Sequence, residues 1–347
     1  METLWFAIAS VVIAMYVVLD GFDFGAGALH LFVARTDRER RQVLAAIGPF
    51  WDGNEVWLLA GGGVLFLAFP KVLASGLSGF YLAIMFVLWV LILRGISIEF
   101  RSHVEDAMWR AFWDAVFACA SLLAPVLFGA ALGNLLRGVP LDEHGWFALS
   151  LFESFSPWGT LGTLDWYTTL AGVLALAAIA HHGALFLAWK TDGEVQARSL
   201  AAAAWLFVVV LILWIVATIA TIIVAPDVYR GWLSRPLAWI CTAVFAAGLL
   251  TSLVARRGGK HLTAFLGSAA FLLGALAATA ASMFPVMLRA TSHPEWSLTA
   301  FNSASGPGGL RAGLWWWSVG AIFVIGYFVM LFRLHRGKAQ ISDGDGY

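Results

Sequence analysis

Charged residues are scarce in this sequence. Asp, Glu, Lys and Arg together make up only 12% of its 347 residues, whereas about a quarter of an ordinary soluble domain is charged. No polar stretch is long enough to enclose a core of its own, and the basic residues form short clusters rather than the long run that suits a nucleic acid. The composition therefore excludes a soluble globular domain and gives no support for nucleic-acid binding.

Cysteine is also nearly absent, since Cys119 and Cys241 are the only two. Both fall in apolar stretches, where isolated thiols are packing residues more often than they are metal ligands or disulfides. The sequence has no Cys-x-x-Cys-His motif, Walker loop or nucleophile elbow, so covalent haem, ATP hydrolysis and serine chemistry lack support. The first residues lack the basic region and cleavage site of a signal peptide, so we expect the first apolar segment to stay in the mature protein.

What the sequence has is apolar and aromatic. Hydrophobic residues make up 61% of the chain, with 18 Trp and 26 Phe, as in a multispanning membrane protein. A hydrocarbon core of roughly 30 Å needs about 20 apolar residues per helix. We predict an all-α polytopic protein with nine transmembrane helices, over residues 5–33, 49–70, 76–98, 111–136, 165–189, 201–224, 236–254, 262–285 and 312–332.

The basic residues alternate between the two sides of these predicted helices. Most Lys and Arg residues lie in the loops after the first, third, fifth and seventh helix and in the C-terminal tail. Because cytoplasmic loops carry the excess of positive charge, this pattern predicts an outside N-terminus and a cytoplasmic C-terminus. An odd number of helices agrees with that arrangement.

Two carboxylates interrupt the first predicted helix. Asp20 and Asp23 belong to a polar stripe with Tyr16, Gly27 and His30, whose members follow one another at spacings of 4, 3, 4 and 3 and so share one helix face. A charge at the centre of a bilayer costs several kcal/mol, so such residues usually have a function.

Two more acids open the second predicted helix. Asp52 and Glu55 lie within its first two turns, near the cytoplasmic interface. They could simply complement the helix dipole. However, the first helix descends toward the same membrane face, so Asp20 and Asp23 extend the set toward mid-membrane. Four acids in that order are what a proton path requires.

A further polar group surrounds the loop near residue 103. Glu99 and Arg101 there are typical of a solvated loop with exposed ion pairs. Arg94 and Asp114, in contrast, lie where their helices should already be apolar. A buried arginine needs a carboxylate, which Asp114 or one of the aspartates of the first helix could supply. A purely structural salt bridge is the alternative interpretation.

His181 and His182 lie well inside the fifth predicted helix. Because adjacent residues point in different directions, at most one of them could ligate a given iron. A haem held between His30 and one of this pair is possible, but a hydrogen-bonded core histidine is favoured.

Several motifs in the first 140 residues together resemble subunit II of the cytochrome bd-type quinol oxidases. They are Leu-Asp-Gly-Phe-Asp-Phe-Gly at 19–25, Trp-Asp-Gly-Asn-Glu-Val-Trp at 51–57, Ser-Gly-Phe-Tyr at 78–81 and Gly-Asn-Leu-Leu-Arg-Gly-Val-Pro at 133–140. The resemblance implies an integral subunit of a bacterial terminal oxidase in the cytoplasmic (inner) membrane, which oxidises quinol and reduces O2 to water.

The resemblance also implies an architecture and partners. The chain would form a single membrane domain over 1–347, with a four-helix bundle in 1–136, a second in 165–285 and a peripheral helix at 312–334. Haem b and haem d would lie in the partner subunit I, with none ligated by this chain. Quinone would be a substrate and a candidate structural ligand, and small accessory single-helix subunits are candidate partners.

The family's site residues transfer to particular positions. The resemblance implies that Asp52 lies in the proton channel and that Trp57 marks the oxygen entrance from the lipid. Asp23, Arg94 and Asp114 match residues linked to assembly. Glu55 departs from the pattern, because some members have Gln there.

The predicted site is therefore divided by role into a proton path, an oxygen entrance and buried or interfacial ion pairs. These are Asp52, Glu55, Asp20 and Asp23 for protons, Trp57 for oxygen, and Arg94, Glu99, Arg101 and Asp114 for the ion pairs. A proton-coupled transporter is the alternative function from the intramembrane acids alone, although no inverted repeat is evident. A purely structural subunit with salt-bridged acids is the third.

Overall fold

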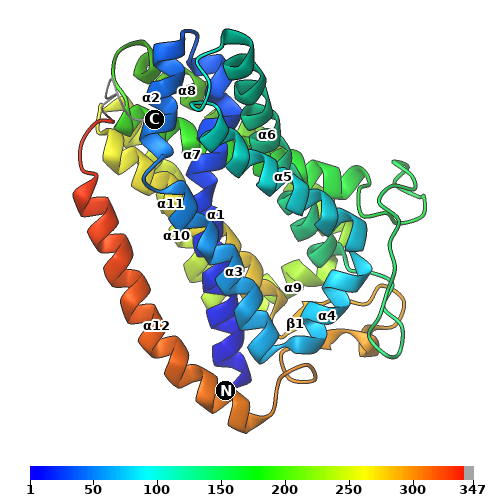
Figure 1. Ribbon diagram of the computed structural model, residues 1–347. Coiled ribbons are helices and arrows are strands. Elements are labelled where there is room, and N and C mark those ends of the chain that lie inside the picture. Colours follow the sequence, from blue (N-terminus) through cyan, green and yellow to red (C-terminus); the bar gives the residue numbers. More distant parts are fainter. Residues whose placement is uncertain (340–347) are drawn as a thin grey trace.

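The computed structural model describes residues 1–339, so the last eight residues of the predicted domain, 340–347, lie outside the described residues. Most of the described chain is helical, and longer non-helical segments lie at 138–165 and 284–306 (Figure 1). Its elements are α1 (Glu2–Val33), α2 (Asp37–Ile47), α3 (Trp51–Ala68), α4 (Pro70–Gly79), α5 (Tyr81–Phe100), α6 (Ala107–Arg137), α7 (Trp166–Lys190), α8 (Gly193–Val224), α9 (Pro226–Ser234), α10 (Pro236–Arg257), α11 (His261–Met283), β1 (Val286–Leu288), a 3-10 turn (Pro294–Trp296), β2 (Leu298–Thr299) and α12 (Pro307–Leu334).

Helix α1 runs through the middle of the molecule (Figure 1) and packs against α3, α6, α7 and α11. Its closest approach to α7 is at Gly25 and Gly183, where a Cβ on either residue would overlap the backbone of the other helix. Small residues of this kind let membrane helices approach closely. The crossing places the polar stripe of α1 inside the bundle, and Asp20 and Asp23 are fully buried.

The helix ends follow local sequence signals. Thr36 and Glu39 form a capping box that starts α2, and the side chains of Asp106 and Asp165 accept hydrogen bonds from the first turns of α6 and α7. These caps satisfy amide groups that would otherwise lack partners. Proline begins α4, α9, α10 and α12, where its missing N–H costs nothing.

Helix α12 lies along one edge of the molecule and touches the rest mainly near its ends (Figure 1). Only Leu310, Gly313 and Leu331 are buried in it. Trp5 Nε1 donates to Leu310 O at 3.1 Å near the start of α12. Near its other end, the rings of Phe328 and Phe332 contact those of Trp57 and Phe50. Its end lies opposite the N-terminus of the chain (Figure 1).

Eight of the nine predicted transmembrane helices correspond to helices long and apolar enough to cross a membrane: α1, α5, α6, α7, α8, α10, α11 and α12. The remaining one, predicted over 49–70, is α3, an 18-residue helix that the acids in its first turns make less apolar. The prediction of one segment over 76–98 needs correction, because α4 ends at Gly79 and a new helix starts at Tyr81. Helices α2 and α9 were not predicted, since both are short and carry little apolar sequence.

Candidate functional site

Arg94 is the centre of a buried charged cluster between α1, α3 and α5. Its side chain is completely inaccessible, Nη1 donates to Asp20 Oδ1 at 2.7 Å, and Nη2 donates to Glu55 Oε1 at 2.8 Å. The guanidinium also lies 4.2 Å from the ring centre of Phe24, a favourable cation–π contact. Among the open alternatives for its carboxylate partner, the structure therefore selects Asp20 and not Asp114.

Asp23 belongs to the same cluster but has a neutral partner. Asn54 Nδ2 donates to Asp23 Oδ2 at 2.7 Å and to Leu19 O at 3.1 Å. Asn54 is completely buried, and the sequence did not identify it as a site residue. The available signal was a polar amide two residues after Asp52, in the first turn of α3. However, helix starts commonly carry such residues.

The four acids of the predicted proton path differ in burial. Asp52 is exposed and has no hydrogen bond or ion pair with any described residue. The side chain of Glu55, one turn further along α3, is 31% exposed, and Asp20 and Asp23 are buried. The acids thus extend from the surface of this chain to the helix that runs through its centre.

Trp57 lies one turn beyond Asn54 on α3. Its ring centre is 5.8 Å from that of Phe328 on α12, and its indole Nε1 is buried with no partner among the described residues. The Trp57 side chain therefore lies where α3 meets α12.

Asp114 forms a second cluster, at the end of the molecule that contains α2. It accepts hydrogen bonds from His30 Nε2 at 2.7 Å, from Arg101 Nε at 2.6 Å and from Arg40 Nη1 at 2.9 Å. Arg101 Nη2 also donates to Asp37 Oδ1 at 2.7 Å. Arg40 and Asp37 are on α2, so the sequence could not identify them without that helix. His30 belongs here and not with Asp23, although both share one face of α1.

Glu39 attaches α2 to the rest of the chain. Its Oε2 accepts from Arg35 N at 2.6 Å, from Thr36 N at 3.0 Å and from Arg198 Nη1 at 3.1 Å. Desolvation by burial opposes the charge, but these donors outweigh it and lower the pKa of Glu39 to about 2. Glu99, predicted with the ion pairs, lies exposed at the end of α5.

The buried histidines make hydrogen bonds to different parts of the core. His182 Nε2 donates to Val18 O at 3.0 Å, and its Nδ1 lies 2.6 Å from Ser268 Oγ. His181 Nδ1 donates to Ala203 O at 3.1 Å. His30 is twelve residues beyond Val18 on α1, roughly 18 Å along the helix axis. These positions do not fit a haem held between His30 and either histidine of α7. No group of three potential metal ligands occurs within residues 1–339.

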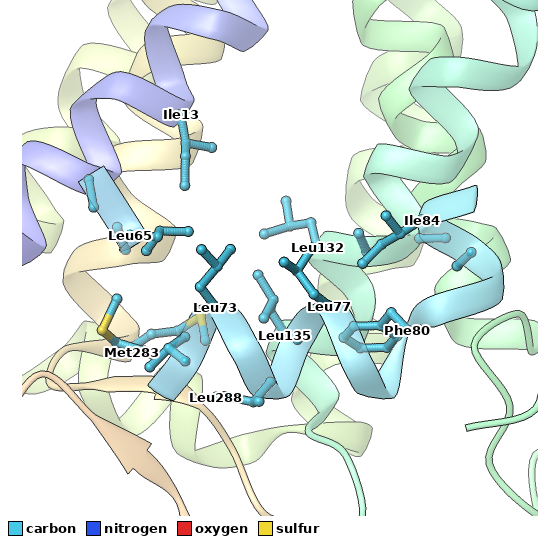
Figure 2. A pocket seen from close by; sticks show the side chains of 18 of the residues that line it. Ile13, Leu65, Leu73, Leu77, Phe80, Ile84, Leu132, Leu135, Met283 and Leu288 are labelled. Atoms are coloured by element: carbon cyan, nitrogen blue, oxygen red, sulfur yellow. The ribbon is translucent and has the colours of Figure 1, made fainter. Parts of the chain in front are cut away.

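Two apolar cavities lie apart from the charged clusters. The first has a volume of about 380 Å3 and is lined by residues of α1, α4, α5, α6 and α11, including Ile13, Leu73 and Leu132 (Figure 2). The second, of about 440 Å3, lies between α6, α7, α8, α9, α10 and α11. Leu132, Leu276 and Thr279 line both cavities, and none of the predicted site residues lines either.

Comparisons with known proteins agree on one family. The family described as "Cytochrome bd terminal oxidase subunit II" matches residues 1–335. Cytochrome bd-I ubiquinol oxidase subunit 2 of Escherichia coli (strain K12) is 31% identical over 342 residues, which cover 90% of this chain and 88% of that protein. Cytochrome bd ubiquinol oxidase subunit 2 of Bacillus subtilis (strain 168) is 31% identical over 349 residues, which cover 99% and 98%.

A solved structure supports the fold independently. A chain of the bd oxidase from Geobacillus thermodenitrificans aligns with a TM-score of 0.74, covering 96% of this chain and 98% of that one. Its sequence identity is 18%, so this similarity concerns the arrangement of the helices.

Proposed function

Because this chain belongs to the cytochrome bd terminal oxidase subunit II family, we propose that it provides proton and oxygen access to haems held by subunit I. The chain is one subunit of an oxidoreductase complex of the respiratory chain, with subunit I as its partner. Family membership decides against the proton-coupled transporter. The observation that carries the proposal is the order of burial of the four acids, from exposed Asp52 to buried Asp20 and Asp23.

The proposal places the chain in the bacterial cytoplasmic membrane with nine crossings. Its N-terminus is outside, and the end of α12 is cytoplasmic. Two features support this orientation. The start of α1 and the end of α12 lie at opposite ends of the molecule (Figure 1), and the basic helix α2 lies at the proposed cytoplasmic end. Residues 1–136 and 165–285 then form the two four-helix bundles. Helix 312–334 is peripheral, as the small buried area of α12 suggests.

In the proposed proton path, Asp52 takes protons at the cytoplasmic side and Glu55 passes them inward. Glu55 suits this role because its side chain is partly exposed and contacts the buried Arg94 directly. Asp20 shares the same guanidinium, so Arg94 connects the outer and inner carboxylates without a gap of apolar side chains. Carboxyl groups within reach of one another, directly or through one water, can exchange protons.

Trp57 is the proposed oxygen entrance. The seam where its ring meets Phe328 is apolar, and a small apolar molecule such as O2 enters such a region without displacing strongly bound water. The peripheral position of α12 would leave that seam open to lipid along part of its length.

The ion pairs of Arg101 and Asp114 are proposed to hold the cytoplasmic ends of α1, α2, α5 and α6 in register for assembly with subunit I. Arg94 would do the same nearer mid-membrane. Removing one member of such a buried pair strands the other charge, which typically costs about 3–5 kcal/mol.

The proposed cofactors are haem b and haem d, both bound by subunit I, with quinol as the reductant. Both ring nitrogens of His182 make hydrogen bonds within this chain, so this histidine has no nitrogen left for an iron. A structural quinone and small single-helix accessory subunits remain part of the same proposal.

The proposed proton path is tested by Asp52→Asn in the assembled complex. We expect normal haem content and slower oxygen reduction, because the amide cannot bind and release the proton. Glu105→Gln is the matched control, since Glu105 is an exposed acid of the loop beside α6. Turnover in Asp52→Asn equal to that of the control, with haem content intact, would contradict the assignment.

A further inference from the structure

Several polar atoms of the Arg94 cluster have no protein partner. They are buried and unpaired among the described residues: Oδ1 of Asp23, Oδ1 of Asn54 and Nε of Arg94. Each such atom costs about 1–3 kcal/mol if nothing binds it. Buried sites with several unsatisfied donors and acceptors ordinarily hold ordered water. The cluster is therefore built to contain water between α1, α3 and α5.

The charges of the cluster do not balance. Asp20, Asp23 and Glu55 supply three carboxylates, and Arg94 supplies one guanidinium. Both terminal nitrogens of Arg94 are occupied, one by Asp20 and one by Glu55. On α7, His182 has both ring nitrogens engaged elsewhere. An ionised carboxylate without a cation is unfavourable in a buried site, so the group with a neutral partner is the one expected to hold a proton.

That group is Asp23, and Asn54 controls its geometry. The two hydrogens of Asn54 Nδ2 have two acceptors, Asp23 Oδ2 and Leu19 O. Both acceptors lack hydrogens when Asp23 is ionised. The Asn54 amide must therefore turn its nitrogen, and not its oxygen, toward α1. The donated hydrogen bond occupies Oδ2, and Oδ1 is left without a protein partner.

We propose that Asp23 stores a proton on Oδ1 within this hydrated cluster and that Asn54 is its positioning residue. This inference rests on the proposed proton path and identifies the residue on that path that holds the proton. A proton that leaves the Glu55 carboxyl breaks the O–H bond there and, relayed through bound water, forms the O–H bond at Oδ1 of Asp23. The same bond breaks when the proton leaves toward subunit I, and the carboxylate returns to its ionised form. No electron is transferred at this site.

Redox-difference infrared spectroscopy of the purified complex tests the store, because a protonated carboxyl has a C=O stretch distinct from that of a carboxylate. We expect a carboxylic-acid band that disappears in Asp23→Asn and moves in frequency in Asn54→Ala. Asn134→Ala is the matched control: Asn134 Nδ2 also donates to two carbonyl oxygens, of Ala130 and Thr163, but contacts no carboxylate. Its band should equal that of the wild type.

Two results would overturn the inference: a band that persists in Asp23→Asn, or a band in Asn54→Ala that is identical to that of Asn134→Ala. If Asp23→Asn does not assemble, Asp23→Glu and Asn54→Ala keep a carboxyl in place, and both must then move the band. The outcome is separate from that of Asp52→Asn, because loss of the proton entrance alters turnover and not the carboxyl that gives the band.

The pH dependence of oxygen reduction gives a second readout of the positioning role. The N–H of Asn54 stabilises the ionised form of Asp23, so Asn54→Ala should move the midpoint of the pH–activity profile to higher pH, by about one unit for one hydrogen bond to a charged group. A merely structural role for Asn54 would lower activity equally at all pH values, and that result would also refute the inference.

Discussion

Replacing Arg94 with leucine should strand the carboxylates that its guanidinium now holds. Arg94 and Asp20 are both completely buried, and the two hydrogen bonds of the guanidinium to Asp20 and Glu55 measure 2.7 and 2.8 Å. In Arg94→Leu the charge of Asp20 keeps its desolvation penalty and loses its only cation. Breaking a buried pair in this way costs about 3–5 kcal/mol, which is a large fraction of the stability of an ordinary domain.

The size of the effect can be separated from loss of the side chain itself. Arg94→Leu combined with Asp20→Leu removes both charges, and much of the lost stability should return, because a buried ion pair is often no better than apolar residues of similar volume. Arg94→Lys keeps a positive charge but lacks the planar fork, so one ammonium cannot hold both carboxylates in the same geometry. Its stability should fall between those of the wild type and Arg94→Leu.

The assay is the midpoint of thermally induced haem loss from the purified complex in detergent, followed by visible absorbance. Arg333→Leu is the control, because Arg333 is an exposed arginine in the last turn of α12. A midpoint for Arg94→Leu equal to that of the control would refute the reasoning. So would a double variant that is no more stable than Arg94→Leu, because the loss would then not be the unpaired charge of Asp20.

Two further predictions concern packing and pH. Gly183→Ala should destabilise the subunit by about 1–3 kcal/mol, because the new Cβ would overlap the backbone of α1 at Gly25; Gly62→Ala, where nothing lies within 4 Å, should be nearly neutral in the same thermal assay. The lowered pKa of Glu39 means that its ionised form favours the folded state. Its contribution should be complete above pH 4.5 and should disappear as the pH falls toward about 2, so an acid titration of unfolding should lose that part of its slope in Glu39→Gln.

The sequence by itself determined the class of protein and most of its helices. A membrane helix satisfies its backbone internally, so length and hydropathy within one segment suffice to predict it, as the agreement for α1, α6 and α7 illustrates. Charged residues are rare within apolar segments, and this was enough to single out Asp20, Asp23 and Arg94, because a charge there is costly wherever the helix packs. The motifs in residues 1–140 were enough to predict the family.

Helices α2 and α4 were harder to predict, because neither depends on a long apolar segment. Helix α2 is polar and starts from a capping box. This local signal marks the start of many helices and says nothing of their function. The break between α4 and α5 at Phe80 lies inside continuous apolar sequence, where hydropathy alone gives no boundary.

Only the tertiary structure decided which charges meet. Spacing along α1 shows that Asp23 and His30 share a face, but the two contact different helices, and one accepts from Asn54 while the other binds Asp114. The same holds for Arg94: of its three candidate partners the packing of α1, α3 and α5 selected Asp20, and it added Glu55, which was not a candidate. The physical reason is that the periodicity of a helix defines which side chains point the same way, whereas the neighbour on that side depends on how the helices pack around one another.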